Sequence, residues 1–113
     1  MTGRLAVVAT PVGNLGDLSD RARERLAGAE VIACEDTRRT RSLLGHLGLA
    51  VPGLRRVDDH TEAAEAEWVV DMVRQGRQVV LITDAGTPAV SDPGQRVVEA
   101  VLDAGLEVET VPG

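Results

Sequence analysis

The feature that most constrains the fold is a regular alternation between short apolar runs and segments with helical periodicity. Five short runs rich in aliphatic and β-branched residues are separated by segments in which apolar residues recur every three or four positions. The strands predicted from these runs are residues 5–9, 31–34, 54–57, 79–83 and 107–111. Strands that alternate with helices are joined by right-handed crossovers, which predicts one α/β domain with a mostly parallel, doubly wound sheet of five strands.

Four helices are predicted between these strands, over residues 17–29, from residue 37 to Gly48, over residues 62–75 and over residues 93–104. Each has an apolar face that we expect to be buried. These faces comprise Leu18, Ala22 and Leu26, then Leu43, Leu44 and Leu47, then Ala64, Trp68, Val69, Met72 and Val73, and finally Val97, Val98, Val101 and Leu102. The side chains available as N-caps are Asp17 or Ser19, Asp36, and Ser91 or Asp92.

The composition argues against several classes of α/β protein. All twelve basic residues are arginines, which disfavours P-loop nucleotide hydrolases and receiver domains because both need a lysine. Trp68 is the only aromatic residue, so a platform for stacking single-stranded bases is missing. A non-catalytic phosphate- or nucleotide-binding module remains an alternative, because the loops after the first and fourth strands are rich in glycine.

The sequence also predicts a cytoplasmic location without membrane contact. No apolar run approaches the roughly 18 residues that span a bilayer, and the N-terminus lacks a basic region followed by an apolar stretch. The single cysteine, Cys34, lies in an apolar run and is expected to be a buried small side chain in a reducing compartment.

Ligands of doubly wound sheets bind beyond the carboxyl ends of the strands, so the loops that start there are the candidate site. The loop over residues 83–94 is long, consists mainly of small residues and is stiffened by prolines. Such a loop exposes backbone N–H and C=O groups, which favours binding of a polar small molecule. In the loop over residues 10–16, Gly13 would allow close approach to a ligand, although an ordinary rigid turn explains this loop equally well.

Charged residues follow the second and third strands. Arg38, Arg39 and Arg41 lie in the first turns of a predicted helix, where they oppose the helix dipole, so a ligand or a solvated face can explain them. After the third strand, carboxylates lie beside His60. No zinc-type spacing connects His60 to His46, the only other histidine, so no metal site is expected.

Three ordered motifs follow the ends of predicted strands. They are Ala9-Thr10-Pro11-Val12-Gly13-Asn14-Leu15-Gly16-Asp17, Glu35-Asp36-Thr37-Arg38, and Thr83-Asp84-Ala85-Gly86-Thr87-Pro88 with Ser91-Asp92-Pro93-Gly94. Together they resemble one family, the tetrapyrrole-methylase-type methyltransferases, and within it the branch that 2′-O-methylates a cytidine of 16S rRNA in the small ribosomal subunit. The resemblance implies a cytoplasmic enzyme of two α/β domains, usually a homodimer, with S-adenosylmethionine in the cleft between the domains. A sibling branch that methylates tetrapyrrole precursors is the alternative.

The resemblance also implies roles for individual residues. The cofactor would contact Asp84, Ala85, Gly86, Thr87, Pro88 and Ser91, and the loop with Pro11, Gly13 and Asn14 would face cofactor and substrate. The family's usual His-Asn-Glu stretch corresponds here to His60-Thr61-Glu62.

A base must remove the proton of the acceptor hydroxyl, and the candidates after strand ends are Glu35, Asp36 and His60. The net charge of −6 is unusual for an RNA-binding chain. Either arginines form a local basic surface, with Arg38 and Arg39 as substrate contacts, or another domain or subunit carries the RNA contacts. The arginines expected at that surface are Arg38, Arg39, Arg41, Arg55 and Arg56.

The length gives a further expectation. Members of the family continue into a second domain, so residues 1–113 are expected to be the N-terminal domain of a two-domain enzyme, with little activity alone.

Overall fold

The computed structural model describes residues 3–10, 18–50, 53–58, 60–83 and 92–111, and within them the predicted order of elements is confirmed. The strands are β1 (Arg4–Ala9), β2 (Val31–Cys34), β3 (Gly53–Arg56), β4 (Gln78–Thr83) and β5 (Val108–Val111). The helices are α1 (Asp20–Ala27), α2 (Thr37–His46), α3 (Glu62–Arg74) and α4 (Asp92–Asp103). None of the described helices is long and apolar enough to cross a bilayer.

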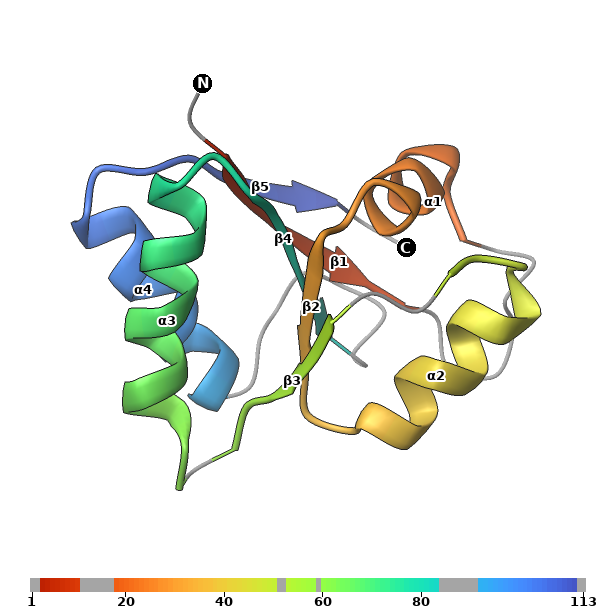
Figure 1. Ribbon diagram of the computed structural model, residues 1–113, viewed down its shortest axis with the longest axis horizontal. Coiled ribbons are helices and arrows are strands. Elements are labelled where there is room, and N and C mark those ends of the chain that lie inside the picture. The colour runs from red at the N-terminus through yellow and green to blue at the C-terminus, as the bar shows by residue number, and fades with distance from the viewer. Residues whose placement is uncertain (1–2, 11–17, 51–52, 59, 84–91, 112–113) are drawn as a thin grey trace.

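The five strands form one sheet in the order β3-β2-β4-β1-β5, and every neighbouring pair is parallel. Helices α1 and α2 cover one face of the sheet and α3 and α4 cover the other (Figure 1). This is the predicted doubly wound arrangement. It follows from the strand order, because the chain moves across the sheet in one direction from β1 to β3 and returns in the other from β3 to β5.

Two apolar layers hold the helices on the sheet. Because side chains alternate along a strand, Leu5 and Val7 of β1 pack under α3 and α4, whereas Ala6 and Val8 pack under α1 and α2. Cys34 is buried, as predicted, in the layer beneath α1 and α2.

The helix caps explain where α1 and α2 begin. The Ser19 hydroxyl accepts a hydrogen bond from the Ala22 N–H at 3.1 Å, so α1 begins at Asp20, three residues later than predicted. Asp36 caps α2 in the same way. Helix α4 begins at Asp92, one residue earlier than predicted. The other cap candidates, Asp17 and Ser91, lie outside the described residues.

Two residues predicted to be buried are exposed. Ala64 is exposed because α3 turns Ala66, Val69, Val70 and Val73 toward the sheet, which leaves Trp68 and Met72 half-buried at its border. Leu102 is 55% exposed because Val97 and Val101 of α4 face the sheet and Leu102 lies about 100° further round the helix.

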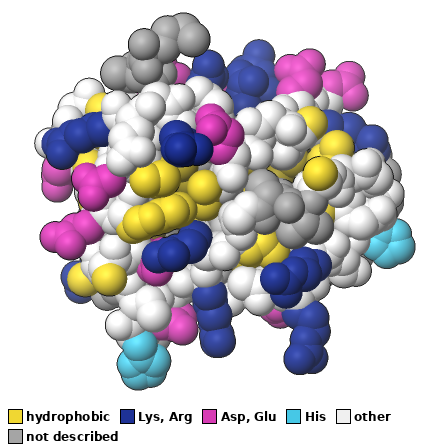
Figure 2. All heavy atoms as spheres, in the orientation of Figure 1, with side chains coloured by type: hydrophobic (Ala, Val, Ile, Leu, Met, Phe, Trp, Pro, Cys, Tyr) yellow, Lys and Arg dark blue, Asp and Glu magenta, His cyan; other side chains and the backbone are white. Residues whose placement is uncertain are grey.

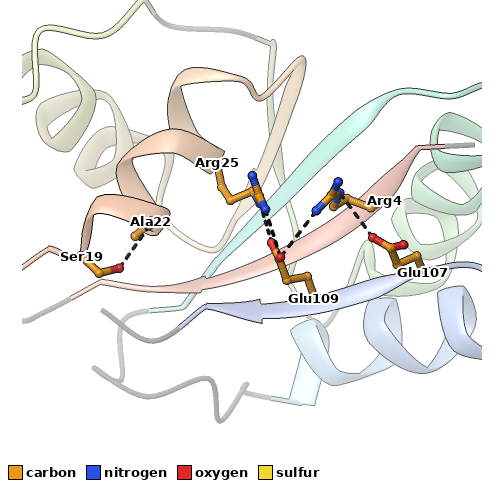
Figure 3. Close-up of polar contacts among 6 residues, drawn as sticks. All are labelled: Arg4, Ser19, Ala22, Arg25, Glu107 and Glu109. Carbon is orange, nitrogen blue, oxygen red and sulfur yellow. Dashed lines mark hydrogen bonds and ion pairs between the residues drawn. The ribbon is translucent and has the colours of Figure 1, made fainter. Parts of the chain in front are cut away.

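Edge strand β5 pairs with β1 in the sheet, and charged side chains also connect it to α1 and β1 (Figure 3). Glu109 accepts hydrogen bonds from Arg25 of α1, and Arg4 of β1 lies 3.5 Å from Glu109 and 3.4 Å from Glu107. These contacts connect β5 to α1 on the face opposite α3 and α4.

Candidate functional site

The ends of β1 and β4 meet at one buried point on the carboxyl edge of the sheet. Ala9 pairs with Thr83, and the Thr83 carbonyl accepts hydrogen bonds from the Thr10 N–H at 2.9 Å and from the Thr10 hydroxyl at 3.0 Å. Thr10 and Thr83 are each 7% exposed. The two candidate ligand loops therefore start from hydrogen-bonded neighbours.

The same point is a topological switch of the sheet. From β1 the chain passes to α1 on one face, whereas from β4 it passes to α4 on the other face. Loops that diverge to opposite faces open a crevice, and this is where doubly wound sheets bind ligands. The predicted contacts of this crevice lie outside the described residues; they are Pro11, Gly13, Asn14, Asp84, Ala85, Gly86, Thr87, Pro88 and Ser91.

A second feature of the carboxyl edge is a cleft of about 370 Å³ at the ends of β2 and β3. The two strand ends are joined beyond the sheet register by a hydrogen bond of 2.9 Å from the Val57 N–H to the Cys34 carbonyl. The cleft thereby gathers two carboxylates and two guanidinium groups predicted as site residues. Its lining residues are Glu35, Asp36, Thr37, Arg38 and Arg56.

Asp36 has a structural role within this cleft. Its carboxylate accepts a hydrogen bond of 3.1 Å from the Arg39 N–H, and its carbonyl accepts one of 2.9 Å from the buried Thr40 hydroxyl. The predicted N-cap is therefore confirmed. Glu35 is exposed and lines the same cleft.

A tight turn before α3 places His60. The Asp58 carboxylate accepts hydrogen bonds from the N–H groups of His60 (2.8 Å) and Thr61 (3.0 Å), and the Thr61 hydroxyl accepts one from the Asp58 N–H (3.1 Å). These bonds, led by that from His60, hold the pKa of Asp58 below its usual value. His60 is exposed and does not line the cleft, and Thr61, where the family usually has asparagine, closes the turn. In the described part of the chain, no three His, Cys, Asp or Glu residues are grouped as metal ligands would be.

Arg55 and Arg56 point to opposite faces of the sheet, although both were expected from the sequence at one basic surface. Arg55 forms a two-pronged ion pair with Glu65 of α3, with N···O distances of 2.9 and 2.8 Å, and its guanidinium lies 4.3 Å from the centre of the Trp68 ring. Arg56 points into the cleft, and its closest carboxylate is Asp58 at 3.5 Å. Neighbouring residues of a strand face opposite sides, so the expectation that Arg55 belongs to the basic surface is wrong.

Charge is segregated between the two helical layers. Helix α2 contains three arginines and no acidic residue, whereas α3 contains four acidic residues and one arginine, and α4 three acidic residues and one arginine. Figure 2 shows basic side chains gathered over α2 and beside β3, and acidic ones over α3 and α4. The acidic net charge therefore does not prevent a basic surface at the carboxyl edge.

The fold and the switch point at its carboxyl edge define a doubly wound α/β domain of the kind that binds ligands there, and comparison with known families identifies it. Residues 4–113 match the family described as Tetrapyrrole (Corrin/Porphyrin) Methylases, and the chain belongs to this family. The solved structure of uroporphyrin-III-C-methyltransferase from Thermus thermophilus matches with a TM-score of 0.71 and 28% identity, covering 100% of this chain and 48% of that one. The methyltransferase CobJ shares the fold, with a TM-score of 0.74, at 24% identity over 99% of this chain and 46% of that one.

Among the relatives are proteins named ribosomal RNA small subunit methyltransferase I. The chain is 44% identical to the protein of this name from Haemophilus influenzae over 113 residues, which are 100% of this chain and 40% of that protein. It is 47% identical to the Xylella fastidiosa protein over 98% of this chain and 40% of that protein. The chain thus spans about 40% of the length of these curated relatives.

Proposed function

We propose that the chain is the N-terminal domain of a two-domain enzyme that transfers a methyl group from S-adenosylmethionine to the 2′-hydroxyl of a cytidine in 16S rRNA. The observation that carries the proposal is the 44–47% identity to the two rRNA methyltransferases over almost the whole chain, against 28% to the uroporphyrin-III methyltransferase. The working form is proposed to be a homodimer in the cytoplasm, where ribosomal subunits are found.

The crevice between β1 and β4 supports the proposed position of the cofactor. Its base is polar, because Thr10 and Thr83 meet there, and a loop of small residues follows Thr83. S-adenosylmethionine would supply a methyl group on a positively charged sulfur. The residues proposed to hold it are Asp84, Ala85, Gly86, Thr87, Pro88 and Ser91, with Pro11, Gly13 and Asn14 facing cofactor and substrate.

Positioning supplies most of the acceleration of such an in-line displacement, and the acceptor hydroxyl must also lose its proton. Of the three candidate bases, we favour Glu35. Asp36 uses its carboxylate to cap α2, and His60 lies outside the cleft. Glu35 lines the cleft together with Arg38 and Arg56, two of the arginines that we propose as RNA contacts.

The arginines at the start of α2 support an RNA surface. Arg38 and Arg39 lie at the positive end of the helix dipole, where basic side chains are unfavourable, so a ligand that carries negative charge would offset this cost. Arg56 enters the same cleft from β3. We therefore propose Arg38 and Arg39, with Arg56, as contacts to RNA phosphates.

The test is transfer of a radiolabelled methyl group from S-adenosylmethionine to small ribosomal subunits that lack the modification. A two-domain protein containing these 113 residues should methylate 16S rRNA at one cytidine ribose. The 113-residue chain should transfer little or nothing, because we propose that a second domain supplies the opposite wall of the cofactor cleft. Methylation of a tetrapyrrole precursor instead of rRNA would support the sibling branch, and efficient transfer by the chain alone would contradict the two-domain proposal.

A further inference from the structure

A groove of about 640 Å³ lies between α3 and α4, on the opposite side of the sheet from α2. Its floor is apolar and made of small side chains, Ala66, Val70 and Ala100. The lining extends from Ala63 to Arg74 along α3, a length of about 16 Å. The groove could therefore hold about five residues of extended peptide.

The walls of the groove carry four carboxylates and the two guanidinium groups of Arg74 and Arg96, and the carboxylates are in an unfavourable arrangement. Glu67 and Asp71 are four residues apart on α3, and Glu99 and Asp103 are four residues apart on α4, so each helix places two like charges side by side. Asp103 is also the last residue of α4, where a negative charge opposes the helix dipole.

The domain itself does little to neutralise these groups. All four side chains are exposed, and within the described ranges no ion pair is formed by Glu67, Asp71 or Asp103. Only Glu99 accepts a hydrogen bond, from the neutral Gln95 side chain at 3.1 Å. Helix α1 provides a contrast, because its acidic pair, Asp20 and Glu24, alternates with arginines and starts at the favourable end of the dipole. Arg74 and Arg96 line the groove, but in the described part of the chain neither forms an ion pair with Glu67, Asp71 or Asp103. The like-charge pairs are therefore only partly offset inside the domain and point to a cationic partner outside it.

We infer that the α3–α4 groove binds a lysine- or arginine-rich segment of a protein that accompanies the RNA substrate. Charge complementarity selects this occupant, because the four carboxylates outnumber the guanidinium groups of Arg74 and Arg96, so the lining repels RNA and attracts cationic side chains. The alanine floor accepts one small apolar anchor between these cationic side chains. The partner's source rests on the proposed function, since a ribosomal subunit presents basic proteins beside its RNA.

The test is calorimetric titration of the chain with a synthetic peptide, Arg-Arg-Ala-Leu-Ala-Arg-Arg, at low and physiological salt. The double variants Glu67→Gln with Asp71→Asn, and Glu99→Gln with Asp103→Asn, should each weaken binding about tenfold. The matched control, Asp20→Asn with Glu24→Gln, removes the same charge from α1 and should change binding less than about twofold. The groove variants should also unfold at a higher temperature than the wild type, because each removes a like-charge pair.

The inference is overturned if the peptide does not bind, or if the α1 variant weakens binding as much as the groove variants do. It is also overturned if sedimentation shows that the chain self-associates and that the groove variants abolish this association. The peptide titration does not require methyl transfer. A failed titration would therefore leave the proposed methyltransferase function intact, and a failed methylation assay would leave the titration result standing.

Discussion

Arg25 near the end of α1 holds Glu109 of β5 through two parallel hydrogen bonds, Nε to Oε1 and Nη2 to Oε2, the second of 3.1 Å (Figure 3). The Arg25 hydrogen bond, reinforced by the positive charges of Arg25, Arg4 and Arg21, holds the pKa of Glu109 below its usual value despite partial burial. This pair fixes an edge strand that otherwise has only β1 as a neighbour in the sheet.

The first prediction concerns stability against pH. Glu109 has a lower pKa in the folded chain than the ordinary value of 4.5, so the folded state binds fewer protons. The stabilisation is therefore complete above pH 4.5 and is lost as the pH falls through the folded-state pKa. Glu109→Gln should lower the free energy of unfolding by about 1 kcal/mol at pH 7 and by little at pH 2. Chemical denaturation at both pH values measures the difference.

Glu107→Gln is the control for this prediction. Glu107 also pairs with Arg4, at 3.4 Å, but its side chain is 62% exposed against 21% for Glu109. Solvent screens exposed pairs, so this variant should change stability by less than about 0.5 kcal/mol at either pH. Equal effects of the two variants would show that β5 is held by its charge in general and not by the Arg25 pair.

The second prediction contrasts two glycines. A Cβ atom at Gly3 would lie 1.8 Å from the carbonyl oxygen of Arg77, the residue before β4, so Gly3→Ala must push the start of β1 away from the start of β4 and should destabilise the chain by about 3 kcal/mol. At Gly45 in α2, a Cβ would meet nothing within 4 Å. Gly45→Ala should therefore stabilise the chain by about 0.5–1 kcal/mol, because alanine favours helix. Thermal unfolding of both variants and of the wild type measures these changes in stability.

The third prediction separates capping from catalysis at Asp36. Asparagine caps helices as well as aspartate does, so Asp36→Asn should leave stability almost unchanged, whereas Asp36→Ala should cost about 1 kcal/mol. In the two-domain enzyme, Asp36→Asn should retain most of the methyl transfer, whereas Glu35→Gln should lower it by about a hundredfold. A large loss of activity in Asp36→Asn with normal stability would instead make Asp36 the base.

The fourth prediction concerns RNA. Changing Arg38 and Arg39 of α2 to glutamine should weaken binding of small ribosomal subunits and lower the slope of log affinity against log salt by about 1.5. Filter binding over a salt series measures both quantities. Arg21 and Arg23 of α1 are equally exposed, and their replacement by glutamine is the charge-matched control. An equal loss of slope in the control would mean that net charge, and not the α2 surface, governs binding.

The strand order and the doubly wound layers could be predicted because alternation and chirality leave few ways to fold such a chain. The errors arose where the sequence does not specify how a helix is rotated. Leu102 follows the buried Val101, and Ala64 lies one turn before Trp68, which is only half-buried. Periodicity alone cannot say which side of an apolar stripe meets the sheet. The late start of α1 was missed because Asp17 and Ser19 are both good caps.

The site was predictable in part. The charged cleft follows from two adjacent parallel strands whose carboxyl ends carry Glu35 and Arg56. The separation of Arg55 from Arg56 could have been found from the alternation of side chains along a strand. Glu65 and Trp68, the partners of Arg55, could not have been predicted, because they lie on α3 and the contact depends on how α3 crosses the edge of the sheet. The roles of the two ligand loops remain predictions.

Segregated charge also has a consequence for the rate of encounter with RNA. At physiological salt, charges are screened beyond about 8 Å, so the α2 arginines act on RNA only when they are almost in contact. From further away, and especially in dilute salt, RNA meets a chain of net charge −6 and is repelled. Association should therefore become faster on the first additions of salt, even though the complex, once formed, dissociates more readily.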